Sequence, residues 1–247
     1  MNLGKLGVWF FLDNLNSHDS AETAKRIESL GYSAFWLPET VGKNPLILAS
    51  WLLSQTTNLV VATGIANIYN REPGVTLAAQ NSLAEQSDGR FLLGLGVSHK
   101  PLVEGLRGVN YGPPVKTMKD YLEKMEASPY AAITHPEKPP TVIAALGPKM
   151  LELAASKCNG AHPYFSSPEH TAMARSIMGP DAWLCVEQKV ILEEDPSKAR
   201  TLARANATMY QSLPNYRNNW LRMGLTEEDI TQSSDKFIDT TFACGKG

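Results

Sequence analysis

Short apolar segments alternate with longer segments of helical periodicity along almost the whole chain, and this alternation constrains the fold more than any other feature. The apolar segments cover residues 6–11, 33–37, 59–65, 91–97, 141–146, 161–165 and 183–192. Helical spacing follows at residues 19–30, 45–55, 74–87, 115–127, from 148, from 168, at 196–212 and around 216–223. Because the expected strands are apolar on both faces, they are typical of a parallel sheet covered by helices.

The number of strand–helix units favours a closed barrel over an open sheet. No linker or low-complexity tract divides the chain, and α/β barrels commonly reach about 250 residues as one domain. We therefore expect a single domain over residues 1–247, of the α/β class and with the (β/α)8 TIM-like barrel fold. Residues 241–247 leave no room for a final strand and helix, so the last β/α unit is expected to be missing from this chain.

Local signals predict where the first strand and the first helix end. The first apolar run stops at Asp13 without a small-residue cleavage site, so we interpret it as a buried strand and not as a secretory signal. Asp19 and, three residues later, Glu22 form the pattern of a capping box, and Gly31 marks the end of that helix.

The composition excludes several classes of partner. The chain is 43% hydrophobic and 19% charged with a formal net charge of -2, which excludes a disordered chain and gives no electrostatic reason to expect nucleic acid or an anionic membrane. No run approaches the roughly 20 apolar residues of a membrane span. Three separated cysteines without a C-x-x-C pair indicate a reducing, cytoplasmic environment. We expect a small molecule as the partner.

In a parallel barrel, the chemistry lies in the loops at the carboxyl ends of the strands. The fourth such junction carries Gly94 and Gly96 within the strand and His99 at its end. Either neighbouring layers pack closely against these glycines or a flat cofactor lies against the strand. A dinucleotide-binding loop is excluded, because His99 replaces the third glycine and no helix is expected to open there. The ordinary pKa of histidine, about 6.5, suits His99 for acid–base chemistry, and a solvated loop residue is the alternative.

Three further junctions carry candidate binding groups. Glu39 follows the second strand, where it either caps the next turn or faces a ligand. A glycine interrupts the third strand within residues 63–67, which indicates a bulge or a close backbone approach. Gly147 and Pro148 open a helix directly after a strand. Its free N–H groups, with Lys149 nearby, suit a phosphate, and a loop-closing glycine explains the same pattern.

Other chemistries find no support in the sequence. No G-x-S-x-G motif precedes a helix, which argues against a serine hydrolase. Cys158, His162 and His170 lack a recognised ligand spacing and no H-E-x-x-H motif occurs, so no metal is expected. No expected strand carries a lysine at its end for a Schiff base.

The strand-end segments taken together resemble a known family. They are residues 34–39 (AFWLPE), 62–66 (ATGIA), 83–96 (LAEQSDGRFLLGLG), 144–149 (AALGPK), 159–164 (NGAHPY) and, with less specificity, 213–218 (LPNYRN). This set, which spans nearly the whole chain, resembles the luciferase-like monooxygenase superfamily. Within it, the segments are most similar to oxidoreductases that depend on the deazaflavin coenzyme F420.

The resemblance implies a cofactor ring at the mouth of the barrel and a set of residues around it. Gly64-Ile65 matches the bulge, often a non-proline cis peptide, that supports the ring. Glu39 matches an acidic position beside the ring, and His99 falls where relatives place a protonating side chain, often a glutamate. The implied cofactor contacts are Glu39, Thr63, Gly64, Ile65, Ala66, Asn67, Gly96, Val97, Ser98, Gly147, Pro148, Lys149, Met150, Pro163 and Tyr164, of which those from Gly147 onward would meet the phosphate tail. The implied substrate contacts are Phe11, Asp13, Asn110 and Tyr111.

The implied function is hydride transfer between F420 and a small organic substrate. His99 would exchange the accompanying proton, and Glu39 would orient it or polarise the ring. The alternatives are an FMN-dependent monooxygenase on the same barrel and a non-catalytic flavin-binding barrel. An isomerase or aldolase acting on a phosphorylated substrate ranks last, because the chain lacks the expected base and lysine. Members of the superfamily are commonly dimers, so a homodimer is expected.

Overall fold

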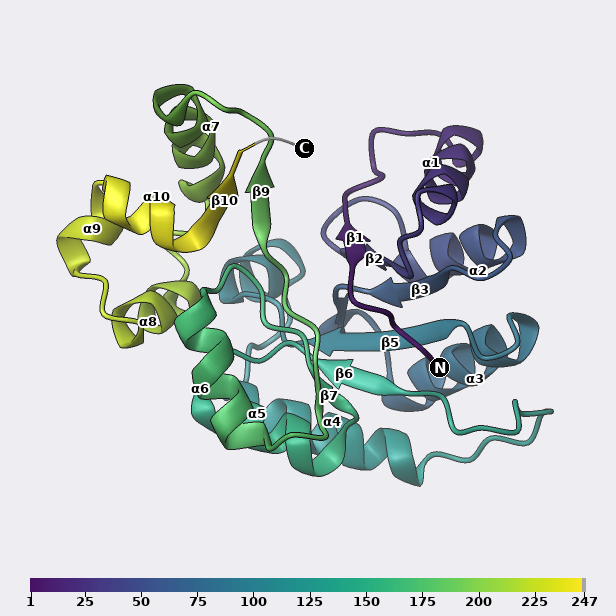
Figure 1. Ribbon diagram of the computed structural model, residues 1–247. Coiled ribbons are helices and arrows are strands. Elements are labelled where there is room, and N and C mark those ends of the chain that lie inside the picture. Colours follow the sequence, from purple (N-terminus) through teal and green to yellow (C-terminus); the bar gives the residue numbers. More distant parts are fainter. Residues whose placement is uncertain (246–247) are drawn as a thin grey trace. The chain divides into compact units, whose positions relative to one another are not determined.

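The structure, a computed structural model, describes residues 1–245, and its contacts define two compact units (Figure 1). The N-terminal unit holds Met1–Ala144 with Lys157–Asn159. The C-terminal unit holds Ala145–Ser156 and the chain from Gly160 onward. The single domain expected over residues 1–247 stays a prediction.

A parallel sheet runs through the N-terminal unit, as the sequence predicts. Its strands lie in the order β1 (Gly7–Trp9), β2 (Ala34–Leu37), β3 (Val60–Thr63), β5 (Phe91–Gly96) and β6 (Thr141–Ile143), and the short β4 (Ala66–Asn67) also pairs with β5. Phe35, Val61 and Leu92, in three neighbouring strands, are fully buried. The strands are apolar without alternation because both of their faces are covered.

The helices of this unit are α1 (Ser17–Ser29), α2 (Pro45–Gln55), α3 (Pro73–Gln86) and α4 (Pro114–Ala127). The prediction for the start of α1 is wrong. Asn16 is the N-cap, and its side chain accepts a hydrogen bond from the Asp19 N–H at 2.9 Å. Glu22 pairs with Lys25 at 2.9 Å and closes no capping box. Asn16 and Asp19 are both good capping residues, and the earlier one takes the role.

A π-helical turn, η2 (Pro101–Leu106), occupies the stretch after β5 where the sequence predicts no helix. It begins where the His99 carbonyl accepts hydrogen bonds from the N–H groups of Leu102 and Val103, each at 3.0 Å. A 3-10 turn, η1 (Ile68–Asn70), follows β4, and the sequence predicts no helix there either. Such single turns need no apolar periodicity, which is why the pattern of hydrophobic residues misses them.

The C-terminal unit contains more helix than strand. Its helices are α5 (Pro148–Lys157), α6 (Pro168–Met178), α7 (Pro196–Ala207), α8 (Pro214–Arg222), α9 (Glu227–Thr231) and α10 (Asp235–Thr241). Its strands are β7 (Gly160–Ala161), β8 (Trp183–Leu184), β9 (Lys189–Ile191) and β10 (Phe242–Cys244).

The strand expected over residues 183–192 is divided in two. Its first part, β8, pairs with β7, and the ladder continues until the Glu187 N–H donates to the Pro163 carbonyl at 2.9 Å. Its second part, β9, pairs in parallel with β10. The single apolar run over residues 183–192 thus pairs with two different strands. Its sequence does not show where it divides, because the division depends on where β7 and β10 lie.

Aromatic side chains fill the core of the C-terminal unit around Phe165. Its ring lies 5.1 Å from that of Trp220 and 5.2 Å from that of Phe242, both edge-on. The Trp220 indole N–H also donates to the Phe165 carbonyl at 3.1 Å. Edge-to-face pairs of this kind add to the hydrophobic gain and fix the relative orientation of the rings.

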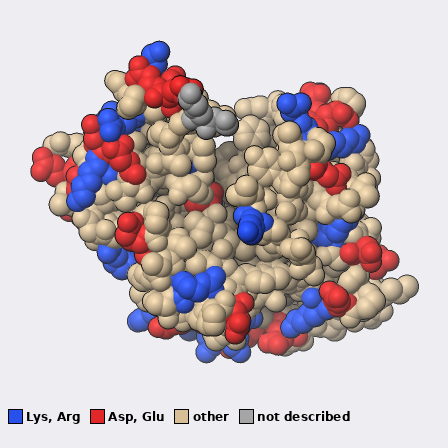
Figure 2. Space-filling view, viewed as in Figure 1, with Lys and Arg blue, Asp and Glu red and all other residues tan. Residues whose placement is uncertain are grey.

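On the face in Figure 2, basic and acidic side chains are interspersed. Within residues 1–245, no helix is both long and apolar enough to cross a bilayer.

Candidate functional site

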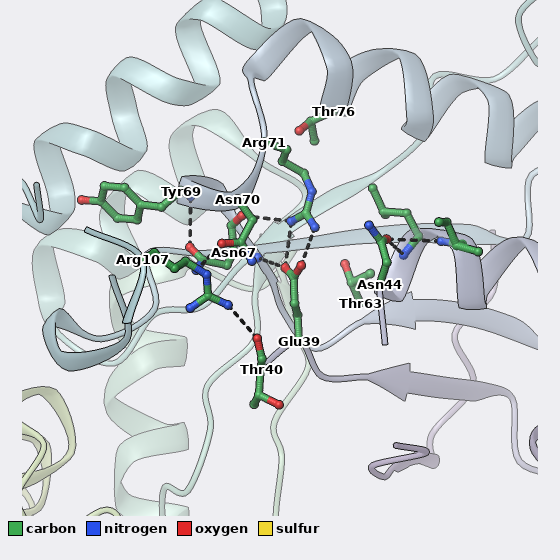
Figure 3. A network of polar contacts seen from close by, with 12 residues as sticks. Glu39, Thr40, Asn44, Thr63, Asn67, Tyr69, Asn70, Arg71, Thr76 and Arg107 are labelled. Atoms are coloured by element: carbon green, nitrogen blue, oxygen red, sulfur yellow. Dashed lines mark hydrogen bonds and ion pairs between the residues drawn. The ribbon is translucent and has the colours of Figure 1, made fainter. Parts of the chain in front are cut away.

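A buried ion pair lies at the carboxyl end of β2 in the N-terminal unit (Figure 3). Arg71 donates to both carboxylate oxygens of Glu39, from Nη1 to Oε2 at 2.8 Å and from Nη2 to Oε1 at 2.5 Å. The Asn67 N–H donates to Oε2 as well, at 2.6 Å. The side chains of Glu39 and Arg71 are only 8% and 7% exposed. Burial would raise the pKa of Glu39, but the hydrogen bonds and charge of Arg71 outweigh it and hold that pKa below its usual range.

This pairing narrows what Glu39 can do. A carboxylate whose two oxygens already accept three strong hydrogen bonds stays ionised and is poorly placed to exchange a proton. It instead fixes the backbone of Asn67 and the guanidinium of Arg71. The sequence analysis expects Glu39 either to cap the next turn or to face a ligand. Neither expectation includes Arg71 as its partner.

The Gly64–Ile65 peptide bond between β3 and β4 is cis, as the resemblance implies. Its surroundings hold this bulge in place. The Trp9 indole N–H donates to the Gly64 carbonyl at 2.8 Å, and the Gly64 N–H donates to the Leu37 carbonyl at 2.8 Å. The bulge therefore presents a fixed backbone at the ends of three neighbouring strands.

The two glycines of β5 make room for this bulge. A Cβ on Gly94 would lie 1.9 Å from the Thr63 carbonyl oxygen, and one on Gly96 would lie 2.3 Å from Ile65 Cδ1. Thr63 Oγ1 donates to the Gly94 carbonyl at 2.7 Å and accepts from the Gly94 N–H at 2.8 Å. Close packing, one of the two alternatives drawn from the sequence, is thus present, and a cofactor lying against this strand stays a prediction.

His99 is half-buried at the end of β5, behind Ser98, whose φ is 56°. The segment that follows is tied to its neighbours by two tyrosines. Tyr111 donates from its hydroxyl to the Ser98 carbonyl at 3.3 Å and stacks on Tyr69 with ring centres 5.6 Å apart. Burial raises the pKa of Tyr111 to about 12. The structure thus brings Ser98 and Tyr111 together next to His99, while Asn110 lies exposed.

The remaining candidates of this unit lie near the end of β1. Phe11 is 41% exposed, with its ring edge-on to that of Trp9 at 5.0 Å. Asp13 is exposed, and its carboxylate accepts from the Lys43 N–H at 2.8 Å. Phe11 therefore offers an apolar surface, whereas Asp13 holds the loop after β2. Ala66 is fully buried, and Val97 is half-buried.

The candidates of the C-terminal unit lie in two places. At the start of α5, the Gly147 carbonyl accepts from the Met150 N–H at 3.1 Å; Met150 is buried, while Pro148 and Lys149 are exposed. After β7, Pro163 is buried and Tyr164 is half-buried.

Tyr164 belongs to a buried polar cluster that the sequence gives no hint of. Lys189 Nζ donates to the Tyr164 hydroxyl at 3.0 Å and lies 4.5 Å from the centre of its ring. Glu187 lies 3.5 Å from Lys189 Nζ, and both side chains are about one tenth exposed. Burial raises the pKa of Glu187 and lowers that of Lys189, and it is opposed by their mutual attraction and, for Glu187, by the hydrogen bond from the Phe165 N–H at 2.9 Å.

Sequence reasoning missed Arg71, Tyr69 and Lys189 as members of these sites. Arg71 stands two residues before Pro73, which opens α3, at the same edge of the sheet as Glu39. A basic residue in that position is the one signal in the sequence that points to a partner for Glu39. Tyr69 and Lys189 carry no such signal, because their partners come from distant segments.

Comparisons with known proteins agree with the resemblance. The family model described as luciferase-like monooxygenase matches residues 7–236. A putative coenzyme F420-dependent oxidoreductase of Mycobacterium tuberculosis is 26% identical over 242 residues, covering 81% of this chain and 69% of the relative.

Two solved structures are similar over most of the chain. An F420-dependent secondary alcohol dehydrogenase in complex with an F420–acetone adduct has a TM-score of 0.74 at 14% identity, covering 97% of this chain and 85% of that one. The FMN complex of the oxygenating constituent of 3,6-diketocamphane monooxygenase from Pseudomonas putida has a TM-score of 0.64 at 15% identity, covering 92% and 79%. At such identities the likeness shows the fold, and it confirms the α/β class of the TIM-like barrel type.

Proposed function

Since the chain belongs to the luciferase-like monooxygenase family, we propose that it is an oxidoreductase that uses coenzyme F420 to move a hydride to or from a small organic substrate. The F420-dependent names of the relative and of the solved structure support this choice over other cofactors. The observation that carries it is the backbone of Gly64 and Ile65, which hydrogen bonds from Trp9 and to Leu37 hold at the strand ends.

The residues present fit such a cofactor at two places. The cofactor, when bound, supplies the hydride chemistry, and the protein positions it and excludes water. In the N-terminal unit, Thr63 to Asn67 would support the ring. In the C-terminal unit, the start of α5 suits a phosphate, because a helix N-terminus carries a partial positive charge and Lys149 lies exposed there.

His99 is the proposed proton-exchanging residue. It lies half-buried at the end of β5, and an imidazole can both accept and donate a proton, as the proposed chemistry requires. Glu39 is proposed as a positioning residue instead, because Arg71 and the Asn67 backbone occupy its oxygens. The substrate would meet Phe11 and the loop with Asn110 and Tyr111.

A fluorescence-quench titration of the purified chain with F420, and in parallel with FMN, tests the proposal. Saturable binding of F420 alone supports it and justifies a screen of alcohols, ketones, aldehydes and enones. Binding of neither compound refutes it.

An FMN-dependent monooxygenase is the second candidate, and the likeness to the FMN-bound monooxygenase favours it. It would require reduced FMN and oxygen. Preferred binding of FMN, followed by product formation only in the presence of oxygen, would replace the first proposal with this one. Tight binding of either cofactor without turnover across the screen would favour a non-catalytic flavin-binding barrel.

The homodimer expected from the resemblance also stays a proposal. On α2, Ile47 is 72% exposed and Trp51 is 40% exposed, and Val75 of α3 is 61% exposed. Ile47 and Trp51, four residues apart on α2, lie on one side of the helix and offer an apolar strip for a second copy. Sedimentation velocity of the purified chain and of Ile47→Glu tests it: a dimer that the substitution dissociates supports this face, and a monomeric parent chain refutes it.

A further inference from the structure

Four segments of the N-terminal unit join the carboxyl end of a strand to the helix that follows it, and they carry His99 and most of the residues proposed to support the cofactor ring. We call them the carboxyl-edge segments; they cover residues 10–16, 38–44, 64–72 and 97–113. Each carboxylate, lysine and arginine side chain in them has a partner within the chain. The acids and bases also cancel in formal charge; they are Asp13, Glu39, Glu72 and Glu104 against Lys43, Arg71, Lys100 and Arg107.

Two of the cations are bound by backbone oxygens. Lys43 Nζ donates to the Leu12 carbonyl at 2.8 Å and also to the carbonyl of Leu15. Arg107 Nη2 donates to the Thr40 carbonyl at 2.7 Å (Figure 3). These contacts join the segment after β2 to the segments after β1 and β5. The other two cations are in ion pairs with carboxylates of the same segments, Arg71 with Glu39 and Lys100 with Glu104.

The two remaining carboxylates accept hydrogen bonds from backbone N–H groups. Asp13 accepts from the Lys43 N–H at 2.8 Å, and Glu72 caps α3 by accepting from the Val75 N–H at 2.9 Å. A charged substrate that entered these segments would lose its hydration, and it could gain a counter-charge only by breaking a contact that already exists. The carboxyl-edge segments therefore favour a neutral substrate over a charged one.

The same segments expose large apolar side chains. Phe11 packs edge-on against Trp9, and the Trp9 indole N–H holds the Gly64 carbonyl of the bulge. This places an apolar ring one residue contact away from the backbone proposed to support the cofactor ring. Five such side chains are between 39% and 70% exposed: Phe10, Phe11, Val41, Leu106 and Val109.

Three of these apolar residues belong to segments that are tied to one another and to His99. Leu106 is the last residue of η2, the turn that begins at the His99 carbonyl. The Val109 N–H donates to a carbonyl within η2 at 3.0 Å. The hydrogen bond from Arg107 holds the segment of Leu106 against the segment that contains Val41. The proposed proton-exchanging residue therefore shares its segment with exposed aliphatic side chains.

We propose that the carboxyl-edge segments take a neutral substrate with an apolar chain, and that Leu106 and Val109 are specificity-determining residues for it. The inference rests on the proposed function and narrows its small organic substrate to the uncharged, apolar alcohols and carbonyl compounds. A substrate of this kind gains affinity in proportion to the apolar area that it removes from water, and it requires no counter-charge from the protein.

Calorimetric titration of the F420-loaded chain with methyl ketones, from butanone to methyl hexyl ketone, tests the inference. Each added methylene should raise the affinity about two- to fourfold until the exposed surface is covered. The oxo acid in which a carboxylate replaces the terminal methyl group of the longest ketone should bind about tenfold more weakly than that ketone, or less tightly still.

Matched variants assign the effect to residues. Leu106→Ser/Val109→Ser should reduce the gain for each methylene and leave the affinity for F420 unchanged, whereas the conservative Leu106→Met/Val109→Ile should retain the gain. The control is Ile133→Ser, which removes an exposed aliphatic side chain from the loop before β6, at the amino edge of the sheet. This control should leave the whole ketone series unchanged.

The results separate the inference from the proposed function. If F420 binds but the ketones do not, or their affinity stays constant along the series, or the oxo acid binds as tightly as the ketone, the inference is wrong and the proposed function stands. A serine variant with the parent's gain for each methylene, or a conservative variant that loses it, refutes the assignment to Leu106 and Val109. A chain that does not bind F420 refutes the proposed function and the inference with it.

Discussion

Removing Arg71 while leaving Glu39 in place should destabilise the N-terminal unit strongly. The two side chains are 7% and 8% exposed, and their hydrogen bonds are 2.8 and 2.5 Å long. In Arg71→Met, the carboxylate would stay buried, with the Asn67 N–H and the Asn70 side chain as its remaining donors. Breaking a buried pair by removing one partner costs about 3–5 kcal/mol, so we expect a loss of about 4 kcal/mol in the free energy of unfolding at pH 7.

The loss of unfolding free energy in Arg71→Met should depend on pH, and the direction of this dependence follows from the pKa of Glu39. Its pKa in the folded parent is lowered from the ordinary value of 4.5, so its contribution is present above that value and is lost as the pH falls through the folded pKa. In Arg71→Met, burial without a cation should raise the folded pKa instead. Protonation then removes the penalty, and the gap between variant and parent should shrink as the pH falls toward 4.5.

Urea unfolding, monitored by circular dichroism at several pH values, measures both the loss of unfolding free energy and its dependence on pH. The double variant Glu39→Leu/Arg71→Met should recover most of the stability, because replacing a whole buried pair by apolar groups is often nearly neutral. Lys25→Met is the matched control: it breaks an exposed pair with Glu22, and we expect no measurable change in the free energy of unfolding. A loss below about 1 kcal/mol in Arg71→Met, or a double variant as unstable as the single one, would refute the reasoning.

Three further substitutions have defined outcomes. His99→Ala should lower turnover about 100-fold in steady-state assays and leave cofactor affinity nearly intact; unchanged turnover would remove His99 from the chemistry. Gly94→Ala should cost about 3 kcal/mol in urea unfolding, because its Cβ would meet a backbone oxygen at 1.9 Å. The control Gly105→Ala meets nothing within 4 Å and should be near neutral; equal effects would contradict the packing argument. Lys189→Met should lower the thermal midpoint by leaving Glu187 buried and unpaired, and a further Glu187→Gln should restore part of it; no recovery would argue against the pairing.

The strands and most helices of this chain are predictable because the signals are local. Apolar segments such as those around Phe35 and Leu92 indicate strands that are buried on both faces, and Pro45 marks a helix start that the structure confirms. The bulge at Gly64 is predictable from the resemblance, which carries family geometry that the residues alone do not.

What the sequence did not predict depends on partners that lie far apart along the chain. Glu39 and Arg71 are 32 residues apart, and the basic residue shortly before α3 is a signal too weak to identify Glu39 as its partner. The same is true of β10, which is too short to show a pattern and becomes a strand by pairing with β9, itself part of the strand predicted over residues 183–192. The N-cap of α1 was missed for a different reason, since Asn16 and Asp19 both satisfy the local rule.

The two glycines of β5 differ in how freely homologous sequences should vary at their positions. A side chain at residue 94 would collide with the Thr63 backbone, and no substitution elsewhere removes a carbonyl oxygen. A side chain at residue 96 would collide with the end of Ile65, which a smaller residue at position 65 would relieve. Among related chains we therefore expect residue 94 to stay glycine. Where residue 96 carries a side chain, we expect a residue smaller than isoleucine at position 65.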